Sequence, residues 1–409
     1  MQQSNSNSRR FYYGYIIAVV AFICTFINAG MIFSFGVFFK PLLNEFGWTR
    51  AMTSGAFTVS WIVTAVASVV MGGLNDKIGP RIVITLSGLL LGLGYLLMSQ
   101  VDNVWQLYLF YGLLCGIGAS GIAVALKSTI VKWFATRMNV ISGIMAAGGG
   151  LGTLVLPIAA SRLIDTYNWR TSYAIIGGFV LVIVVLLAQF LKREPVQIGQ
   201  ISNAEDRQNI YTSEEGFDLR EAVHTRQFWF AFTIHCLTGF LLATMMVHIV
   251  PHANDLGISA LNAANILAIM GGIGMVGSIA TGIAGDKFGI KWTFIIIFIM
   301  MASSYFWVSN INELWMFYLF AAVFGLTRKA GVLGAPLIAK LFGFKAHGMI
   351  YGVMNLAFSI GSAIGPLLAG YIFDINDIYM LAFMISGTLG IVAVIVSSLL
   401  RPTGLEKTL

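Results

Sequence analysis

The chain has 409 residues, of which 58% are hydrophobic and only 10% are charged, and its formal net charge is +7 at pH 7. About a quarter of the residues in an ordinary soluble domain are charged, so this composition excludes a soluble globular protein. The three cysteines all fall within long apolar segments, which argues against a disulfide framework or a metal site. No cofactor is predicted.

Apolar segments long enough to cross a bilayer as helices recur along the whole chain, at about 20 residues per crossing. They are too continuously apolar for the strands of a membrane barrel, whose residues alternate over about ten positions. We therefore predict an all-α membrane protein with twelve transmembrane helices. The predicted helices span residues 14–38, 51–74, 82–100, 105–131, 139–162, 171–191, 227–250, 261–285, 292–308, 314–339, 348–373 and 379–400.

The polar N-terminus ends in Arg9 and Arg10, immediately before the first apolar segment. Along the predicted helices, most of the 24 Lys and Arg residues fall on the same side of the membrane as this N-terminus. Because positively charged loops stay in the cytoplasm, we expect both termini to be cytoplasmic in the cell's inner (plasma) membrane. The basic residues are accounted for by their position in cytoplasmic loops, so the net positive charge does not indicate binding to nucleic acid. The expected partner is the lipid bilayer.

Three polar residues in the first half of the chain are candidates for a binding site. Asn28, in the middle of the first segment, either lines a cavity or hydrogen-bonds a neighbouring helix, and Ser120 in the fourth segment is a weaker candidate. Lys127 lies near the cytoplasmic end of that segment. It either lines the cavity, where its field draws anions inward, or extends to the membrane interface.

Charged residues cluster at the turn after the second segment, where Gly79 and Pro80 end the helix. Asp76, Lys77 and Arg81 flank this turn. Acidic residues are favoured near helix N-termini and basic residues near helix C-termini. Such a cluster can therefore hold two bundles of helices together on one side of the membrane and separate when the bundles move. The alternative is that these residues only anchor the topology.

The same turn recurs in the second half of the chain. The sequence Gly-Gly-Leu-Asn-Asp-Lys-Ile-Gly at 72–79 matches Gly-Ile-Ala-Gly-Asp-Lys-Phe-Gly at 282–289, so Asp286 and Lys287 repeat the acid and base of the first turn. Glycines, a methionine and a proline at 143–157 match those at 352–366, and the distance along the sequence is nearly the same as that between the two turns. The repeat predicts two pseudo-symmetric six-helix bundles.

The predicted bundles are separated by one polar segment rich in charged residues. We assign residues 1–191 to the N-terminal bundle, 192–226 to a cytoplasmic linker and 227–409 to the C-terminal bundle.

Two further cations, Arg328 and Lys329, lie halfway along the tenth segment, whereas none of the 17 acidic residues lies inside an apolar segment. A charge near the bilayer centre costs several kcal/mol unless it faces water and has a partner. The expected partner is therefore an anion from outside. Because successive helical residues point about 100° apart, we expect the two side chains not to share one direction.

Arg328 is favoured as the direct ligand, because its planar guanidinium suits a carboxylate, and Lys329 is kept as a second candidate. The alternative is a buried pair that reaches backbone carbonyls. Asn355 in the eleventh segment is a candidate of the same kind as Asn28, either a cavity ligand or a hydrogen-bonding partner of a neighbouring helix. His248, at the outer end of the seventh segment, either carries a coupling proton or is an interfacial residue.

The turns at 72–81 and 282–291 resemble the signature GxxxDxxGxR/K of the major facilitator superfamily. The stretch 133–152, WFATRMNVISGIMAAGGGLG, is similar to the fourth-to-fifth helix signature of the branch that holds monocarboxylate transporters and oxalate–formate antiporters. The resemblance implies a gating role for the two turns. It also implies a substrate site near the membrane midplane, between the two bundles.

The chain lacks three charged residues that are typical of members of this branch. The usual arginine in the eighth helix is Ser278 here, and the lysine that the oxalate exchangers carry in the eleventh helix falls near Phe358. The aspartate that often accompanies that arginine is also missing. The cations have therefore moved to the tenth helix, which leaves the substrate and proton coupling open.

The leading hypothesis is a secondary active or facilitative transporter of a small organic anion, foremost a monocarboxylate, working by alternating access in symport with protons or antiport with a counter-anion. The alternatives are an exchanger for dicarboxylates or sulfonates and a multidrug exporter of the same fold, although an exporter of cations needs a cavity acid that this chain lacks. We expect no enzyme, because no His-Glu metal cluster, GxSxG motif or phosphate loop is present.

Overall fold

The structure, a computed structural model, describes residues 13–134, 137–193 and 216–401. Within these ranges, twelve helical spans are long and apolar enough to cross a membrane, which confirms the predicted all-α fold. The first half contains α1 (Gly14–Phe46), α2 (Arg50–Ile78), α3 (Pro80–Met98), α4 (Val104–Leu107), η1 (Tyr108–Cys115), α5 (Gly116–Trp133), α6 (Met138–Thr166) and α7 (Trp169–Ala188). The second half contains α9 (Leu219–Val223), α10 (Arg226–Asp255), α11 (Ala260–Phe288), α12 (Ile290–Val308), α13 (Leu314–Thr327), η4 (Ala330–Leu333), α14 (Gly334–Phe342), α15 (His347–Asn376) and α16 (Met380–Ser398).

The repeated turn has the same backbone geometry in both halves. Gly79 joins α2 to α3 with a φ of 83°, and Gly289 joins α11 to α12 with a φ of 84°. A side chain at either position would be strained, because only glycine adopts positive φ freely. The sequence repeat thus corresponds to a structural repeat, and each helix that follows turns back across the membrane.

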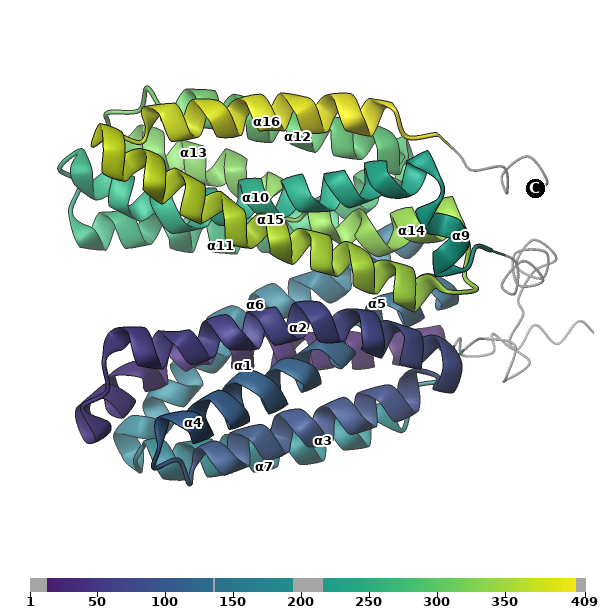
Figure 1. Cartoon of the computed structure of the whole chain (residues 1–409), viewed down its shortest axis with the longest axis vertical. Coiled ribbons are helices and arrows are strands. Elements are labelled where there is room, and N and C mark those ends of the chain that lie inside the picture. Colours follow the sequence, from purple (N-terminus) through teal and green to yellow (C-terminus); the bar gives the residue numbers. More distant parts are fainter. Residues whose placement is uncertain (1–12, 135–136, 194–215, 402–409) are drawn as a thin grey trace, which may run out of the picture.

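Each half has its own apolar core, and the halves meet mainly through two pairs of helices. The pairs are α2 with α15 and α6 with α11. Figure 1 shows α2 and α15 converging at the end of the molecule that carries α9 and diverging toward the opposite end. We call the α9 end the linker end.

Glycine allows this close contact between the halves. A Cβ atom added at Gly72 would lie 2.0 Å from the carbonyl oxygen of Gly348, and one added at Gly143 would lie 2.5 Å from that of Ser278. Small residues let helices approach until their backbones touch. The contact at the linker end is therefore a close fit of backbone against backbone.

Only the two ends of the predicted linker, residues 192–193 and 216–226, lie within the described residues. The polar N-terminus and most of 192–226 lie outside them, so the domain boundaries stay a prediction. From Gly216 on, the chain packs on the second half: the Phe217 amide donates to the Phe342 carbonyl at 2.9 Å, and Lys345 pairs with Asp218 at 3.1 Å. Glu221 completes a capping box that starts α9.

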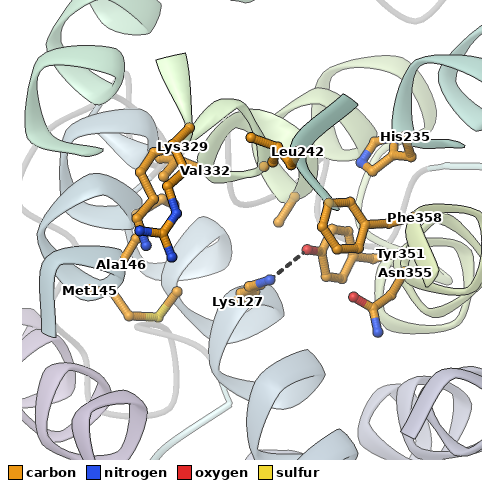
Figure 2. Close-up of a pocket in the computed structure, with 14 residues that line it drawn as sticks. Lys127, Met145, Ala146, His235, Leu242, Lys329, Val332, Tyr351, Asn355 and Phe358 are labelled. Atoms are coloured by element: carbon orange, nitrogen blue, oxygen red, sulfur yellow. Dashed lines mark hydrogen bonds between the residues drawn. The ribbon is translucent and has the colours of Figure 1, made fainter. Parts of the chain in front are cut away.

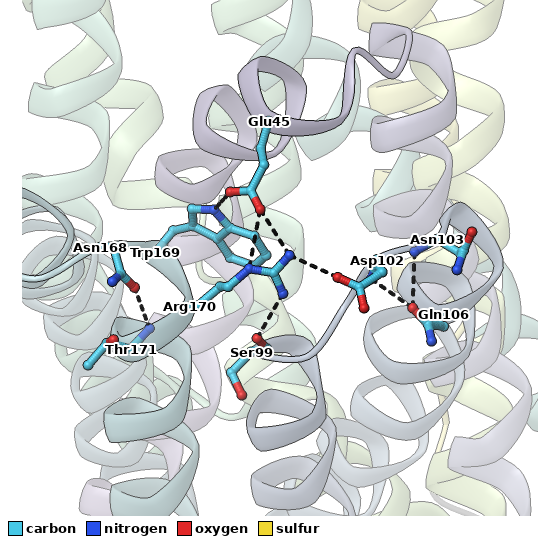
Figure 3. Close-up of polar contacts among 9 residues, drawn as sticks. All are labelled: Glu45, Ser99, Asp102, Asn103, Gln106, Asn168, Trp169, Arg170 and Thr171. Carbon is cyan, nitrogen blue, oxygen red and sulfur yellow. Dashed lines mark hydrogen bonds and ion pairs between the residues drawn. The ribbon is translucent and has the colours of Figure 1, made fainter.

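At the other end of the first half, Arg170 ties three helix ends together (Figure 3). Its guanidinium lies 2.9 Å from a carboxylate oxygen of Glu45 and 3.0 Å from one of Asp102, and it donates to the Ser99 carbonyl at 3.1 Å. Trp169 donates to the other Glu45 oxygen at 2.5 Å. The network joins the ends of α1 and α3 to the start of α7.

Candidate functional site

A cavity of about 200 Å³ lies between the two halves. The first half contributes residues of α5 and α6, and the second half contributes residues of α10, the α13–η4–α14 segment and α15 (Figure 2). The lining residues are Lys127, Ser142, Met145, Ala146, His235, Leu242, Arg328, Lys329, Gly331, Val332, Ala335, Tyr351, Asn355 and Phe358.

All three cations singled out in the sequence line this one cavity, although they come from different halves. Lys127 is on α5, and Arg328 and Lys329 follow α13. Among the described residues of the lining, none carries a carboxylate. The cavity therefore presents uncompensated positive charge in a mostly apolar wall, an arrangement that favours an anionic ligand.

The expectation that Arg328 and Lys329 do not share a direction is wrong. The tenth span is not one helix: α13 ends at Thr327, and Lys329 has φ −102° and ψ 25° before the 3-10 turn η4 begins. The argument from helical rotation fails because the two residues lie at this break. Both side chains therefore reach the same cavity.

The two side chains pack against glycines of α11 at ordinary van der Waals distances. A Cβ atom added at Gly271 would lie 3.6 Å from Nη1 of Arg328, and one at Gly274 would lie 3.7 Å from its Cδ and 4.0 Å from Cε of Lys329. Among the described residues, neither cationic side chain makes an ion pair or a hydrogen bond to a backbone carbonyl. The alternative of a pair satisfied by carbonyls is not what the structure shows.

Lys127 lines the cavity, as one of its two predicted positions requires. Its Nζ donates a hydrogen bond to Oη of Tyr351 at 2.8 Å and lies 5.2 Å from the centre of that ring (Figure 2). Asn355 lies four residues further along α15, on the same face, and also lines the cavity. These contacts cross from the first half to the second.

Three other candidates lie outside the cavity lining. Asn28 of α1 donates to the Ala119 carbonyl of α5 at 3.3 Å, whereas Ser120 donates to the Ile117 carbonyl of its own helix at 2.7 Å. His248 is buried, with Nδ1 3.2 Å from Oη of Tyr379 and Nε2 3.0 Å from the Pro366 carbonyl oxygen. The structure thus brings together four of the six predicted substrate ligands.

Tyr351 and His235 belong to the cavity and were not singled out in the sequence. Tyr351 is detectable in retrospect, because it precedes Asn355 by one helical turn and shares its face. His235 places Nδ1 2.8 Å from the Ala231 carbonyl oxygen and sets its ring edge against Tyr351, with centroids 6.4 Å apart. No spacing signal distinguished His235 from the other histidines.

The two repeated aspartates each bind the first turn of a helix in the opposite half. Asp76 of α2 accepts hydrogen bonds from the backbone amides of Gly348 and Met349, at 3.0 and 2.9 Å. Asp286 of α11 accepts from Nδ2 of Asn139 at 2.6 Å and from the amide of Val140 at 3.2 Å. A carboxylate at a helix N-terminus satisfies free amides and complements the helix dipole.

The basic residues of the predicted gating set do not make these contacts between halves. Lys77 and Lys287 are exposed, and Lys287 lies over the ring of the adjacent Phe288. Arg81 is also exposed and donates to Gln189 at 2.9 Å, within the first half. The aspartates, and not their basic neighbours, connect the two halves at the linker end.

Comparisons with known proteins agree with this architecture. A sequence model described as Major Facilitator Superfamily matches residues 21–284 and 275–408. The chain is 27% identical over 357 residues to the uncharacterized MFS-type transporter YhjX of Escherichia coli (strain K12), covering 85% of each. It is 25% identical over 400 residues to monocarboxylate transporter 11 of Homo sapiens, covering 92% of this chain and 80% of that protein.

A shorter match joins the chain to the oxalate:formate antiporter of Oxalobacter formigenes, at 29% identity over 248 residues, covering 60% of this chain and 56% of that protein. Among solved structures, a double-tryptophan mutant of XylE superposes with a TM-score of 0.79 at 13% identity, covering 96% of each chain. The fucose:proton symporter FucP of E. coli superposes with a TM-score of 0.72 at 16% identity, covering 96% of this chain and all of that one. At these identities the structural likeness shows the fold alone.

Proposed function

Because this chain belongs to the Major Facilitator Superfamily, we propose that it is a secondary active or facilitative transporter that carries a small organic anion, foremost a monocarboxylate, by alternating access. The observation that carries the proposal is the cavity between the halves, which is lined by three cations and by no described carboxylate. Both halves contribute cations, so an anion bound there contacts both moving parts of the transporter.

The chemistry of the cavity fits a short carboxylate. The guanidinium of Arg328 presents paired N–H donors to two carboxylate oxygens, whereas Lys329 and Lys127 act as point charges. The cavity volume of about 200 Å³ is below the roughly 300–1,000 Å³ of sites for drug-sized ligands. The small volume of the cavity and the lack of acidic residues in its described lining both argue against a multidrug exporter.

The transport cycle follows from the contacts at the linker end. Asp76 and Asp286 hold the halves together there, while the helices diverge toward the opposite end (Figure 1). If both termini are cytoplasmic in the inner membrane, as the charge distribution predicts, this conformation is closed on the cytoplasmic side. Release of both aspartates and closure of the outer end would then carry the anion inward, in symport with protons or antiport with a counter-anion.

A second candidate function is exchange of dicarboxylates or sulfonates. It is favoured by the count of cavity cations, since one carboxylate compensates only one of the three positive charges. A dianion would engage Arg328 and Lys329 in one half and Lys127 in the other.

Uptake into proteoliposomes tests the proposal. Purified protein should take up a labelled two- to four-carbon monocarboxylate saturably, and unlabelled short carboxylates should compete, whereas sugars and amphipathic cations should not. Stronger competition by dicarboxylates or sulfonates would favour the second candidate. Transport of an organic cation that carboxylates do not inhibit would contradict both.

A further inference from the structure

We propose that the hydrogen bond between Lys127 and Tyr351 is released by the substrate, so that anion binding removes one of the contacts that keep the linker end closed. The inference rests on the proposed function, because it requires an anion in the cavity. It assigns to Tyr351 a positioning role. Its hydroxyl is hydrogen-bonded to Lys127 when the site is empty, and this bond breaks when the anion binds.

The first turns of α15 carry a series of polar contacts to the first half. At the linker end, Gly348 and Met349 bind Asp76. His347, the first residue of α15, places Nδ1 3.1 Å from Oγ of Ser128, and both residues are fully buried. One turn further into the membrane, Tyr351 accepts the hydrogen bond from Lys127.

Of these polar contacts, only the bond between Lys127 and Tyr351 lies in the cavity wall. Both residues line the cavity, whereas Asp76, Ser128 and His347 do not. Figure 2 shows the bond reaching across the cavity from the α5 side to α15, beside Asn355. A bound substrate can therefore compete directly for this contact and not for the others.

The tyrosine is fixed and the lysine is mobile. The Tyr351 side chain is 3% exposed, and its ring lies parallel to that of His347, with centroids 6.3 Å apart and an interplanar angle of 8°. The edge of His235 packs on it from α10. A Lys side chain keeps several rotatable bonds, so Lys127 is the partner that moves when a better acceptor arrives.

A carboxylate is that better acceptor. The hydrogen bond from Lys127 to Tyr351 already has a charged donor, and a carboxylate adds the attraction between opposite charges, which a phenol oxygen does not offer. Among the described lining residues, no carboxylate competes with the substrate for Lys127. The anion therefore replaces Tyr351 as the hydrogen-bond acceptor of Lys127. The contact between α5 and α15 then loses the hydrogen bond that lies deepest in the membrane.

This exchange of partners couples binding to conformation. The empty carrier keeps the bond and resists opening at the linker end, whereas the loaded carrier lacks it. By linkage, whatever weakens the bond also makes anion binding tighter, since the anion no longer has to displace Tyr351. The coupling favours exchange of one anion for another over return of the empty carrier.

Tyr351→Phe removes the hydroxyl and keeps the ring. We expect the ratio of net anion uptake to anion exchange in proteoliposomes to rise by about threefold to tenfold, the effect of one hydrogen bond, and the apparent Kd for the anion to fall by a similar factor. Net uptake is measured into vesicles without internal anion, and exchange into vesicles loaded with it. Binding is measured by titrating the purified protein with the same anion.

Two matched variants separate this role from a merely structural one. Tyr111→Phe removes a buried hydroxyl that donates to the Ile32 carbonyl within the first half, and Ser128→Ala removes a contact between halves that the substrate cannot reach. Both should leave the ratio of net uptake to exchange and the anion Kd unchanged.

An unchanged ratio in Tyr351→Phe, or weaker anion binding, would overturn this inference while the proposed function stands. Wild-type vesicles that move no small anion would overturn the proposed function and the inference with it. If Ser128→Ala raised the ratio of net uptake to exchange as Tyr351→Phe does, loss of any contact at the linker end would have this effect. That result would also overturn the role assigned to the substrate.

Discussion

Arg328→Ala is expected to lower anion uptake into proteoliposomes by about 100-fold or more, while the protein still folds. Truncating one partner of a desolvated charge pair costs about 2–5 kcal/mol, and about 1.4 kcal/mol corresponds to a factor of ten. The Arg328 side chain makes no ion pair with the described residues, so its loss leaves no internal partner unsatisfied. Folding is followed by gel filtration and thermal unfolding.

Two further variants locate the effect in the cavity. Arg162→Ala removes an exposed guanidinium at the end of α6 and should leave uptake unchanged. Gly331→Phe keeps every charge but fills the cavity, because a Cβ atom at Gly331 meets no other atom within 4 Å and the side chain can extend into the space. It should abolish uptake as Arg328→Ala does. Full uptake by Arg328→Ala would remove Arg328 from the site.

Asp76→Ala should shift the protein toward the conformation that is open at the linker end. The substitution removes the acceptor for two backbone amides at the start of α15, and loss of such a helix cap costs about 1–2 kcal/mol. That free energy corresponds to a shift of roughly tenfold in the ratio of the two conformations. Transport should fall because return to the conformation that is closed at the linker end becomes less favourable.

The shift is measured by labelling a cysteine introduced at Ser142, which lines the cavity, with a membrane-impermeant thiol reagent applied from the linker side. We expect roughly tenfold faster labelling in Asp76→Ala than in the parent protein, and a similar increase in Asp286→Ala because the contacts are repeated. Lys77→Ala, beside Asp76 but exposed, is the matched control. Equal labelling of all variants would contradict the role of the aspartates.

The sequence predicts the helices and their repeat because both depend on local properties. Length and hydropathy determine the spans, and the Asp-Lys turns with Gly79 and Gly289 reveal the two halves. The break at Lys329 is not predictable in this way, since glycines such as Gly331 beside it also occur inside continuous helices, as Gly149 does in α6. The shared direction of Arg328 and Lys329 was therefore missed.

The cavity residues are harder to predict for a different reason. In a membrane bundle, the faces toward lipid and toward other helices are both apolar, so hydropathy does not tell which face a polar residue occupies. Asn28 and Asn355 look equivalent in the sequence, yet only Asn355 lines the cavity. Likewise His235, and not His248, borders the cavity, because packing between the halves decides which residues meet.

Thermal unfolding of the purified protein in the presence of small ligands tests the central claim most directly, because a ligand that binds the folded state stabilises it in proportion to occupancy. Short carboxylates, dicarboxylates and sulfonates are compared with sugars and amines, for the wild type and for Arg328→Ala. We predict that at least one anion raises the unfolding temperature of the wild type in a concentration-dependent manner and fails to do so in Arg328→Ala. Stabilisation by sugars or amines, with no response to any anion, would contradict the assignment of the cavity as an anion site.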